Sequence, residues 1–120
     1  MDQAITRALE TGRTIDITTI GRESGQPRRI EIWFHTIDGH MYITGTPGRR
    51  DWYANMLANP AFTFHLKEGV TADLPAHARP ITDPAEKRAV LQRILTNLER
   101  TSDLDKWVAD SPLVEVLFDA

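Results

Sequence analysis

The chain of 120 residues contains no cysteine. Disulfide bridges and thiolate catalysis are therefore excluded, and a reducing cytoplasm is the expected location. No run of about twenty apolar residues is present, so we expect neither a membrane-spanning helix nor a membrane partner. The formal net charge of −3 argues against general nucleic-acid binding, because such binding needs a basic surface.

The residues that are present, 41% hydrophobic and 26% charged, are typical of an ordinary globular domain. Because the chain has no internal repeat and no dividing linker, we expect one domain over residues 1–120. The positive charge is unevenly distributed. Five of the 14 Lys and Arg residues are arginines between Arg22 and Arg50, which predicts a local basic patch on an acidic protein.

Hydrophobic periodicity predicts both strands and helices. Strands are expected over 13–20, 29–37, 40–45, 61–67, 70–82 and 112–118. Helices are expected over 2–10, 51–59, 83–100 and 104–108, the third capped by Asp83 with Pro84 at its first position. The order lacks βαβ repetition, so the expected class is α+β, with six mostly antiparallel strands that close into a small barrel and helices outside.

The most distinct hairpin has Asp38-Gly39 as its predicted type I′ turn, which puts Ile37 opposite His40, Phe34 opposite Ile43 and Ile32 opposite Gly45. Strand alternation then gives two faces. The core face carries Ile32, Phe34, Thr36, Met41 and Ile43. The second face carries Glu31, Trp33, His35, His40, Tyr42 and Thr44. Aromatic and histidine side chains are unusual on a solvent face, so we expect this second face to meet another subunit or a planar ligand.

The segment GRESGQPRR, Gly21 to Arg29, is longer and more basic than a hairpin needs. Its glycines, with Gly25 among them, permit backbone N–H groups to converge on an anion. Ser24 adds a hydroxyl, and Arg22, Arg28 and Arg29 can bind phosphate or carboxylate oxygens. The alternative is a solvated loop whose arginines only add charge.

A second cluster, TGTPGRRDWYAN, spans residues 44–55. Arg49 and Arg50 precede a helix whose N-terminus also favours anions. Trp52 and Asn55 are one turn apart, so they can lie beside a flat heterocycle and its polar edge. The alternative is that Trp52 packs in the core with its neighbours on the helix.

Other chemistries are weakly indicated. His35 and His40 share a hairpin face with Glu31 nearby, but no third imidazole or thiolate is close in sequence, so we expect no metal site. Ser24 lacks the strand-turn-helix setting of a nucleophilic serine, so a hydrolase is disfavoured. No catalytic side chain is predicted.

Two motifs carry a resemblance to a known family. The loop matches Gly-x-x-Ser-Gly-x-x-Arg at Gly21, Ser24, Gly25 and Arg28, and the helix matches Trp-Tyr-x-Asn at Trp52, Tyr53 and Asn55. With a hairpin between them, the chain resembles the deazaflavin-dependent nitroreductase family. That family belongs to the flavin-type split β-barrel superfamily, which includes pyridoxamine 5'-phosphate oxidase-like proteins.

The resemblance implies a homodimer that binds coenzyme F-420 and transfers hydride to a quinone, nitroaromatic or activated alkene. It assigns Arg22, Ser24, Gly25 and Arg28 to the phosphate and acidic tail. The remaining implied cofactor contacts are Thr44, Gly45, Thr46, Arg49, Arg50, Trp52 and Asn55. Glu31 stands where the family often has proline, and together with Trp33 it could reshape the groove.

Two alternatives stay open on the sequence. The first is a split-barrel reductase that binds FMN. The second is a non-catalytic protein that sequesters a flavin or haem-type cofactor. In each case the expected partner is a small molecule, and the protein itself supplies binding, orientation and exclusion of water.

Overall fold

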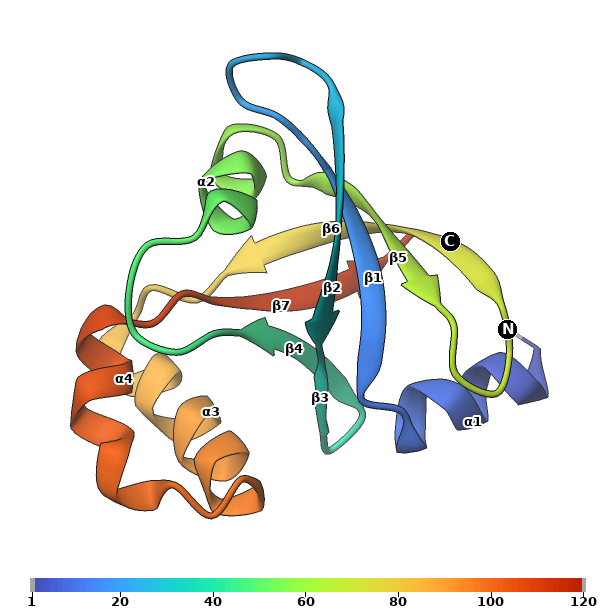
Figure 1. Cartoon of the computed structure of the whole chain (residues 1–120). Helices are drawn as coiled ribbons and strands as arrows, with labels where there is room; N and C mark the ends of the chain where they lie inside the picture. The colour runs from blue at the N-terminus through green and yellow to red at the C-terminus, as the bar shows by residue number, and fades with distance from the viewer. Residues whose placement is uncertain (1, 120) are drawn as a thin grey trace.

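A curled antiparallel sheet forms the body of the protein in the computed structural model, which describes residues 2–119 (Figure 1). Its strands are β1 (Thr14–Ile20), β2 (Pro27–Trp33), β3 (His35–Ile37), β4 (His40–Thr44), β5 (Ala61–Leu66), β6 (Ala72–Pro80) and β7 (Leu113–Phe118). They lie in the order β2-β1-β5-β6-β7-β4-β3. The paired neighbours are all antiparallel. The predicted α+β class and antiparallel half-barrel are confirmed, with seven strands in place of six.

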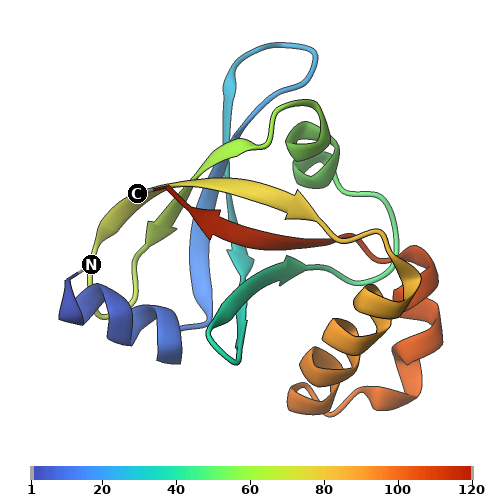
Figure 2. The same ribbon diagram turned by 180° about the vertical axis from the view of Figure 1, so that it is seen from behind.

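Helices flank the sheet at different places. They are α1 (Gln3–Thr11), α2 (Asp51–Ala58), α3 (Pro84–Asn97) and α4 (Leu104–Asp110), with a 3-10 turn at Thr101–Asp103. Figure 2 shows α3 and α4 side by side at one end of the sheet and α1 at the opposite end. The Asp83 carboxylate caps α3 as predicted, because it accepts a hydrogen bond of 2.9 Å from the Glu86 N–H.

The extra strand arises from a break at Phe34. This residue alone separates β2 from β3, yet the two strands occupy opposite edges of the sheet. The Phe34 N–H donates to the Arg13 carbonyl over 2.9 Å, and its ring is 1% exposed against Phe64. One residue can join both edges only because the sheet curls until they meet.

The break divides the predicted hairpin into a confirmed part and a wrong part. Asp38 and Gly39 have φ values of 51° and 81°, as a type I′ turn requires. Ile37 pairs with His40 as predicted. The extension of the same pairing to Ile32 opposite Gly45 is wrong, because Ile32 pairs with Ile15 of β1.

Part of the second face of the hairpin is covered by the protein's own helices, whereas Glu31, Trp33 and His40 on this face are exposed. Tyr42 is 8% exposed and belongs to a buried cluster with residues of α3 and α4. The Thr44 hydroxyl is buried and donates to the Pro112 carbonyl over 2.6 Å. Burial lowers the pKa of His35 to about 4. The expectation that this face meets another subunit or ligand is therefore wrong for its buried part, whereas Trp33 stays 47% exposed.

Two hydrophobic clusters share the sheet between them. The larger fills the barrel and includes Phe34, Ile43, Trp52 and Phe64. The smaller lies between the hairpin and helices α3 and α4, where Leu91, Ile94 and Leu95 are buried as the helix periodicity predicted. Phe34 and Ile43 thus share one core, as expected. The site described below lies at the rim of the larger cluster.

Replacing Phe34 by alanine tests the closure of the sheet. Removal of a fully buried phenylalanine costs about 3–5 kcal/mol, so the free energy of unfolding should fall by that amount. Leu57→Ala is the control, because Leu57 is 55% exposed on α2 and its loss should cost at most about 0.5 kcal/mol. Urea denaturation measures both. Equal effects of the two changes on the free energy of unfolding would show that the Phe34 ring does not stabilise the closed end of the sheet.

Candidate functional site

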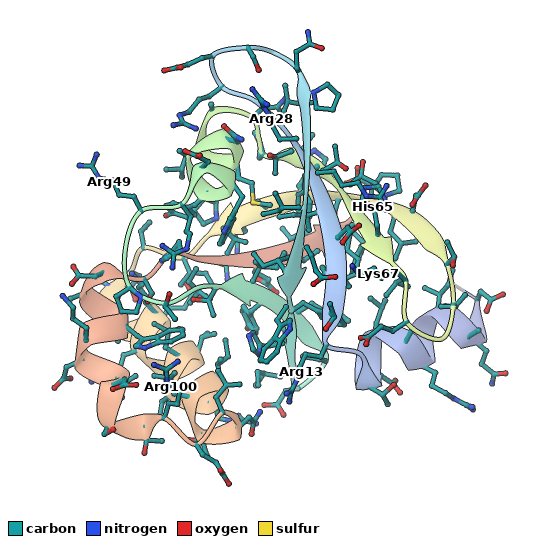
Figure 3. The ribbon with its side chains drawn as sticks, in the orientation of Figure 1. Arg13, Arg28, Arg49, His65, Lys67 and Arg100 are labelled. Carbon is teal, nitrogen blue, oxygen red and sulfur yellow. The ribbon has the colours of Figure 1, made fainter. Side chains whose placement is uncertain are left out.

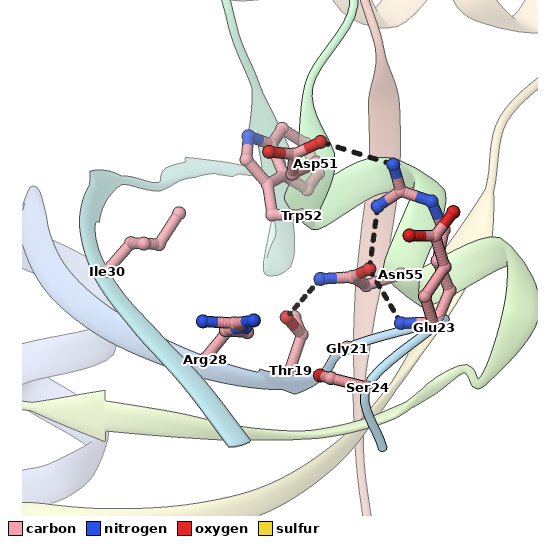
Figure 4. A pocket seen from close by; sticks show the side chains of 10 residues that line it. Thr19, Gly21, Glu23, Ser24, Arg28, Ile30, Asp51, Trp52 and Asn55 are labelled. Atoms are coloured by element: carbon pink, nitrogen blue, oxygen red, sulfur yellow. Dashed lines mark hydrogen bonds and ion pairs between the residues drawn. The ribbon is translucent and has the colours of Figure 1, made fainter. Parts of the chain in front are cut away.

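A cavity of about 560 Å³, here called the loop cavity, lies between the β1–β2 loop (residues 21–26), strand β2 and the first turns of α2 (Figure 4). Its lining residues are Thr19, Gly21, Arg22, Glu23, Ser24, Arg28, Ile30, Asp51, Trp52 and Asn55. Five of them were predicted as cofactor contacts: Arg22, Ser24, Arg28, Trp52 and Asn55. The two sequence motifs, which are far apart along the chain, therefore meet in one place.

The β1–β2 loop is shorter and more tightly bonded than expected. The Gly21 N–H donates to the Gln26 carbonyl over 2.8 Å, and the Gly25 N–H donates to the Gly21 carbonyl over 2.9 Å. The Gln26 N–H donates to Ser24 Oγ over 3.2 Å. These backbone amides donate to acceptors within the loop. The expectation that they converge on an anion is therefore wrong. The Ser24 hydroxyl hydrogen remains available to a ligand.

Gly21 is required by space. A Cβ at this position would lie 2.5 Å from Ser24 Oγ and 3.6 Å from Arg28 Nε. A larger residue would therefore displace Ser24 Oγ, whereas it would lie in ordinary contact with Arg28. Gly25 is required by conformation, since its φ is 68° and nothing lies within 4 Å of its missing Cβ.

Asn55 fastens the loop to the helix and the sheet (Figure 4). Its side chain is 4% exposed. Asn55 Oδ1 accepts hydrogen bonds from the Arg22 backbone N–H at 3.1 Å and from Arg22 Nη1 at 2.9 Å. Asn55 Nδ2 donates to Thr19 Oγ1 over 3.2 Å. The amide is thus occupied within the protein, and its geometry fits a positioning role better than direct contact with a ligand edge.

The three arginines of the GRESGQPRR segment lie on two sides of the sheet. Arg22 donates to Asp51 Oδ1 over 3.3 Å at the cavity rim. Arg29 faces the opposite side, where its Nε donates to Asp16 Oδ2 over 3.0 Å. Arg28 lines the cavity and forms no ion pair with the residues that the structure describes. Strand alternation separates Arg28 from Arg29, so only Arg22 and Arg28 can bind an anion in the cavity.

The opposite wall is apolar. Trp52 is 6% exposed and packs in the barrel core, with its ring edge-on to Tyr53 at 5.9 Å between centroids. Ile30 is 40% exposed on the inner side of β2. An anion-binding end beside an apolar wall suits an amphipathic ligand that carries both a phosphate and a flat ring. No lining residue is a histidine or lysine, so the cavity is built to bind rather than to exchange protons near neutral pH.

The other predicted contacts lie outside this cavity. Gly25 is at the loop tip, and Arg49 and Arg50 line a separate cavity. Thr46 is bound by Arg50, whose Nη2 donates to the Thr46 carbonyl at 2.8 Å and to its hydroxyl at 2.6 Å. A Cβ on Gly45 would lie 3.3 Å from Arg50 Nε.

Sequence reasoning missed several lining residues, chiefly Thr19, Ile30 and Asp51. Thr19 and Ile30 belong to strands in which every second residue looks like core. Asp51 is the first residue of α2, and Arg50 holds the capping position. Only the pairing of β1 with β2 could have placed Thr19 beside Arg28, with which it is in register.

Glu31 and Trp33 do not narrow the cavity. Glu31 pairs with Lys67 on the outer face of the sheet. Trp33 lies beneath the Arg13 guanidinium, 4.9 Å from its carbon to the ring centroid. Neither residue lines the loop cavity. The departure from the family pattern at Glu31 therefore leaves this cavity unobstructed.

Known structures share this architecture. An F420 reductase aligns with a TM-score of 0.72 and 19% identity, over 100% of this chain and 97% of the other. A FAD-binding protein from Mesorhizobium loti aligns with a TM-score of 0.73 and 16% identity, over 100% and 91%. A pyridoxamine 5'-phosphate oxidase-like protein from Listeria innocua aligns with a TM-score of 0.72 and 12% identity, over 97% and 91%. The fold that these structures share with the chain is a split β-barrel.

Residues 1–116 match the F420H(2)-dependent quinone reductase family, and the chain belongs to it. The protein is therefore a deazaflavin-dependent oxidoreductase, and its cofactor is coenzyme F420. The expectation drawn from the loop and helix motifs is confirmed. Within residues 2–119, no helix is long and apolar enough to cross a membrane.

Asn55→Ala tests the positioning role. The change leaves the part-buried Arg22 N–H and the buried Thr19 hydroxyl without their partner, so the free energy of unfolding should fall by about 1–3 kcal/mol. The Arg22 amide should also exchange its hydrogen faster, since the loop loses its attachment to α2. Thr19→Val is the matched control, because it removes only the bond to Nδ2 and should leave exchange at Arg22 slow. Slow exchange in both variants would refute the role.

Proposed function

We propose that the loop cavity binds the phosphate-bearing part of reduced F420 and that the physiological acceptor is a quinone. The observation that carries the first proposal is Arg28, a cation without an ion pair among residues 2–119, in a cavity that Ser24 also lines. The family to which the chain belongs supports the second. Arg28 and Arg22 would hold the phosphate through charge-assisted hydrogen bonds, and Ser24 would donate its hydroxyl.

The ring would extend from this cavity along Trp52 toward residues 44–46. Trp52 forms the apolar wall of the cavity. The Thr44 side chain is buried away from that wall, so this segment can offer only its backbone to a ring. Gly45 supports the arrangement. Because it has no side chain, its backbone beside Arg50 is accessible to a ring.

When bound, the reduced deazaflavin supplies the hydride. The protein's part is to hold the cofactor by its phosphate, to align the ring against Trp52 and to exclude water. Reduction of a quinone to a hydroquinone consumes one hydride and one proton. The proton would come from water, because no residue that lines the loop cavity is a phenol, imidazole or ammonium group, and Tyr53 lines the separate cavity on the other side of α2.

We also propose that the protein acts as a homodimer in the cytoplasm. Strand β2 is an edge strand, and six of its seven residues are exposed. Ile30 and Trp33 on this strand are 40% and 47% exposed, which is unusual for large apolar side chains on a free edge. Ile30 lies on the inner face of β2 and Trp33 on its outer face. A second copy placed along this edge would therefore contact both residues and cover the opening of the loop cavity.

The dimer proposal predicts a sedimentation coefficient of a two-chain particle at micromolar concentration. Trp33→Lys should shift the distribution toward the monomer, because it places a charge in the apolar contact. Leu117→Lys, at a similarly exposed residue on β7, should leave the dimer intact. A monomeric wild-type protein would contradict the proposal.

Arg28→Ala tests the cofactor site. A charge-assisted hydrogen bond contributes about 1.5–3 kcal/mol, so F420 affinity should fall roughly ten- to a hundredfold. The turnover rate at saturating cofactor should stay nearly unchanged, because contacts to the phosphate are the same in the ground and transition states. Fluorescence titration and steady-state kinetics give the two quantities.

Arg29→Ala is the matched control. This neighbouring arginine is bound to Asp16 on the opposite face of β2, so its loss should leave F420 affinity unchanged. The melting temperature of Arg28→Ala should also stay close to that of the wild type. If instead Arg28→Ala lowers the melting temperature and leaves affinity intact, Arg28 is structural and the proposed site is wrong.

A further inference from the structure

A second cavity, here called the basic cavity, lies on the other side of α2. It measures about 450 Å³ and lies between residues 47–50 and helices α3 and α4. It shares no lining residue with the loop cavity. Consecutive residues of α2 separate the two, because Trp52 lines the loop cavity and Tyr53 lines the basic cavity.

The charge of the basic cavity is strongly positive. Its lining includes four cations, Arg49, Arg50, Lys87 and Lys106, and one carboxylate, Asp110. Lys106 forms an ion pair with Asp110, which satisfies that carboxylate. Three cations therefore remain without a carboxylate partner among residues 2–119.

These three cations differ in how they are held. Arg50 is fixed by hydrogen bonds to Thr46 and to the Arg49 carbonyl. Lys87 is half-buried and forms no ion pair with the described residues, and its burial lowers the pKa of its ammonium group. Arg49 extends outward from the segment before α2 (Figure 3). The Asp110 carboxylate offsets part of the lowering of the Lys87 pKa, and an anion bound beside Lys87 would offset more of it.

An independent observation comes from Ser111, which lines the same cavity. Ser111 is 3% exposed, and its Oγ is buried with no hydrogen-bond partner among residues 2–119. Buried hydroxyls are nearly always hydrogen-bonded, so the Ser111 hydroxyl is a candidate donor to a group that enters the cavity. A hydroxyl and three cations together are the donors that a carboxylate or phosphate group needs.

We infer that the basic cavity is a second anion site, which binds a carboxylate or phosphate group through Lys87, Arg50 and Ser111. The anion belongs either to the acidic tail of the cofactor or to an acidic hydride acceptor. Only this choice of source rests on the proposed function. The existence of the site depends on the residues above and can be tested without F420.

Inorganic phosphate is the probe for the site itself. Backbone NMR shifts of Gly48 and Ser111 report the basic cavity, whereas those of Ser24 and Gly25 report the loop cavity. We expect phosphate to shift the first pair, and the dissociation constant from that pair to rise about tenfold in Lys87→Met. Arg88→Met is the control, because Arg88 is an exposed neighbour on α3 that pairs with Asp105 and does not line the cavity.

Ser111→Ala separates a ligand-binding role from a structural one. Loss of an unpartnered hydroxyl should weaken phosphate binding at Gly48 and leave the melting temperature unchanged or higher. The proposal is overturned if phosphate fails to shift Gly48 and Ser111 in the wild type. It is also overturned if Lys87→Met and Arg88→Met bind phosphate equally well.

Two further measurements on Lys87→Met distinguish the sources. If the anion is the cofactor tail, the F420 dissociation constant rises and the KM ratio of a carboxylated to an uncarboxylated quinone stays constant. If the anion belongs to the acceptor, that ratio rises and F420 binding is unchanged. A variant that alters neither quantity overturns the link to this reaction. Failure of wild-type protein to bind F420 would instead refute the proposed function and leave the phosphate result standing.

Discussion

The closure of the sheet at Phe34 is the constraint on which the rest of the structure depends. Strands β2 and β3 are the two edges of a seven-stranded sheet, and one residue of chain connects them. Such a short connection forces the edges together at that end. The Phe34 ring, buried against Phe64, and its N–H bond to Arg13 hold the closed end in place.

The functional cavity follows from the same geometry. Away from Phe34, β2 runs toward the β1–β2 loop, and β4 runs toward residues 44–46, so the two strands separate (Figure 1). Helix α2 lies at the opening between them, with Trp52 in the barrel core and Asn55 bonded to the loop. The barrel is therefore open on the side where the loop cavity lies, away from its closed end.

Local features were predictable because their causes are local. The Asp38-Gly39 turn, the Asp83 cap and the buried stripe of α3 each depend on a few neighbouring residues. The loop and helix motifs also identified five lining residues and the cofactor. The break at Phe34 was not predictable, because it depends on a hydrogen bond to Arg13 and on the pairing of Ile32 with Ile15. Alternation states which residues share a face, but not which helix will cover that face.

The site shows the same division. Sequence spacing placed Trp52 and Asn55 on one side of a helix, but the partners of the Asn55 amide are Thr19 and Arg22, more than thirty residues away. The outer face of the sheet holds another long-range arrangement that no motif announces. His65 Nε2 lies 2.7 Å from Thr18 Oγ1, and His65 Nδ1 lies 2.7 Å from Asp73 Oδ1. Three strands had to pair in register before these side chains could meet.

The shared sheet between the two hydrophobic clusters makes the helical end inseparable from the barrel. On β7, Leu113 belongs to the cluster under α3 and α4, whereas the next residue, Val114, belongs to the barrel core. On β4, Tyr42 and Ile43 divide in the same way. A shortened chain without α3 and α4 would expose the apolar side chains on the outer surface of both strands to solvent. The barrel strands therefore depend on α3 and α4 for the burial of one of their two faces.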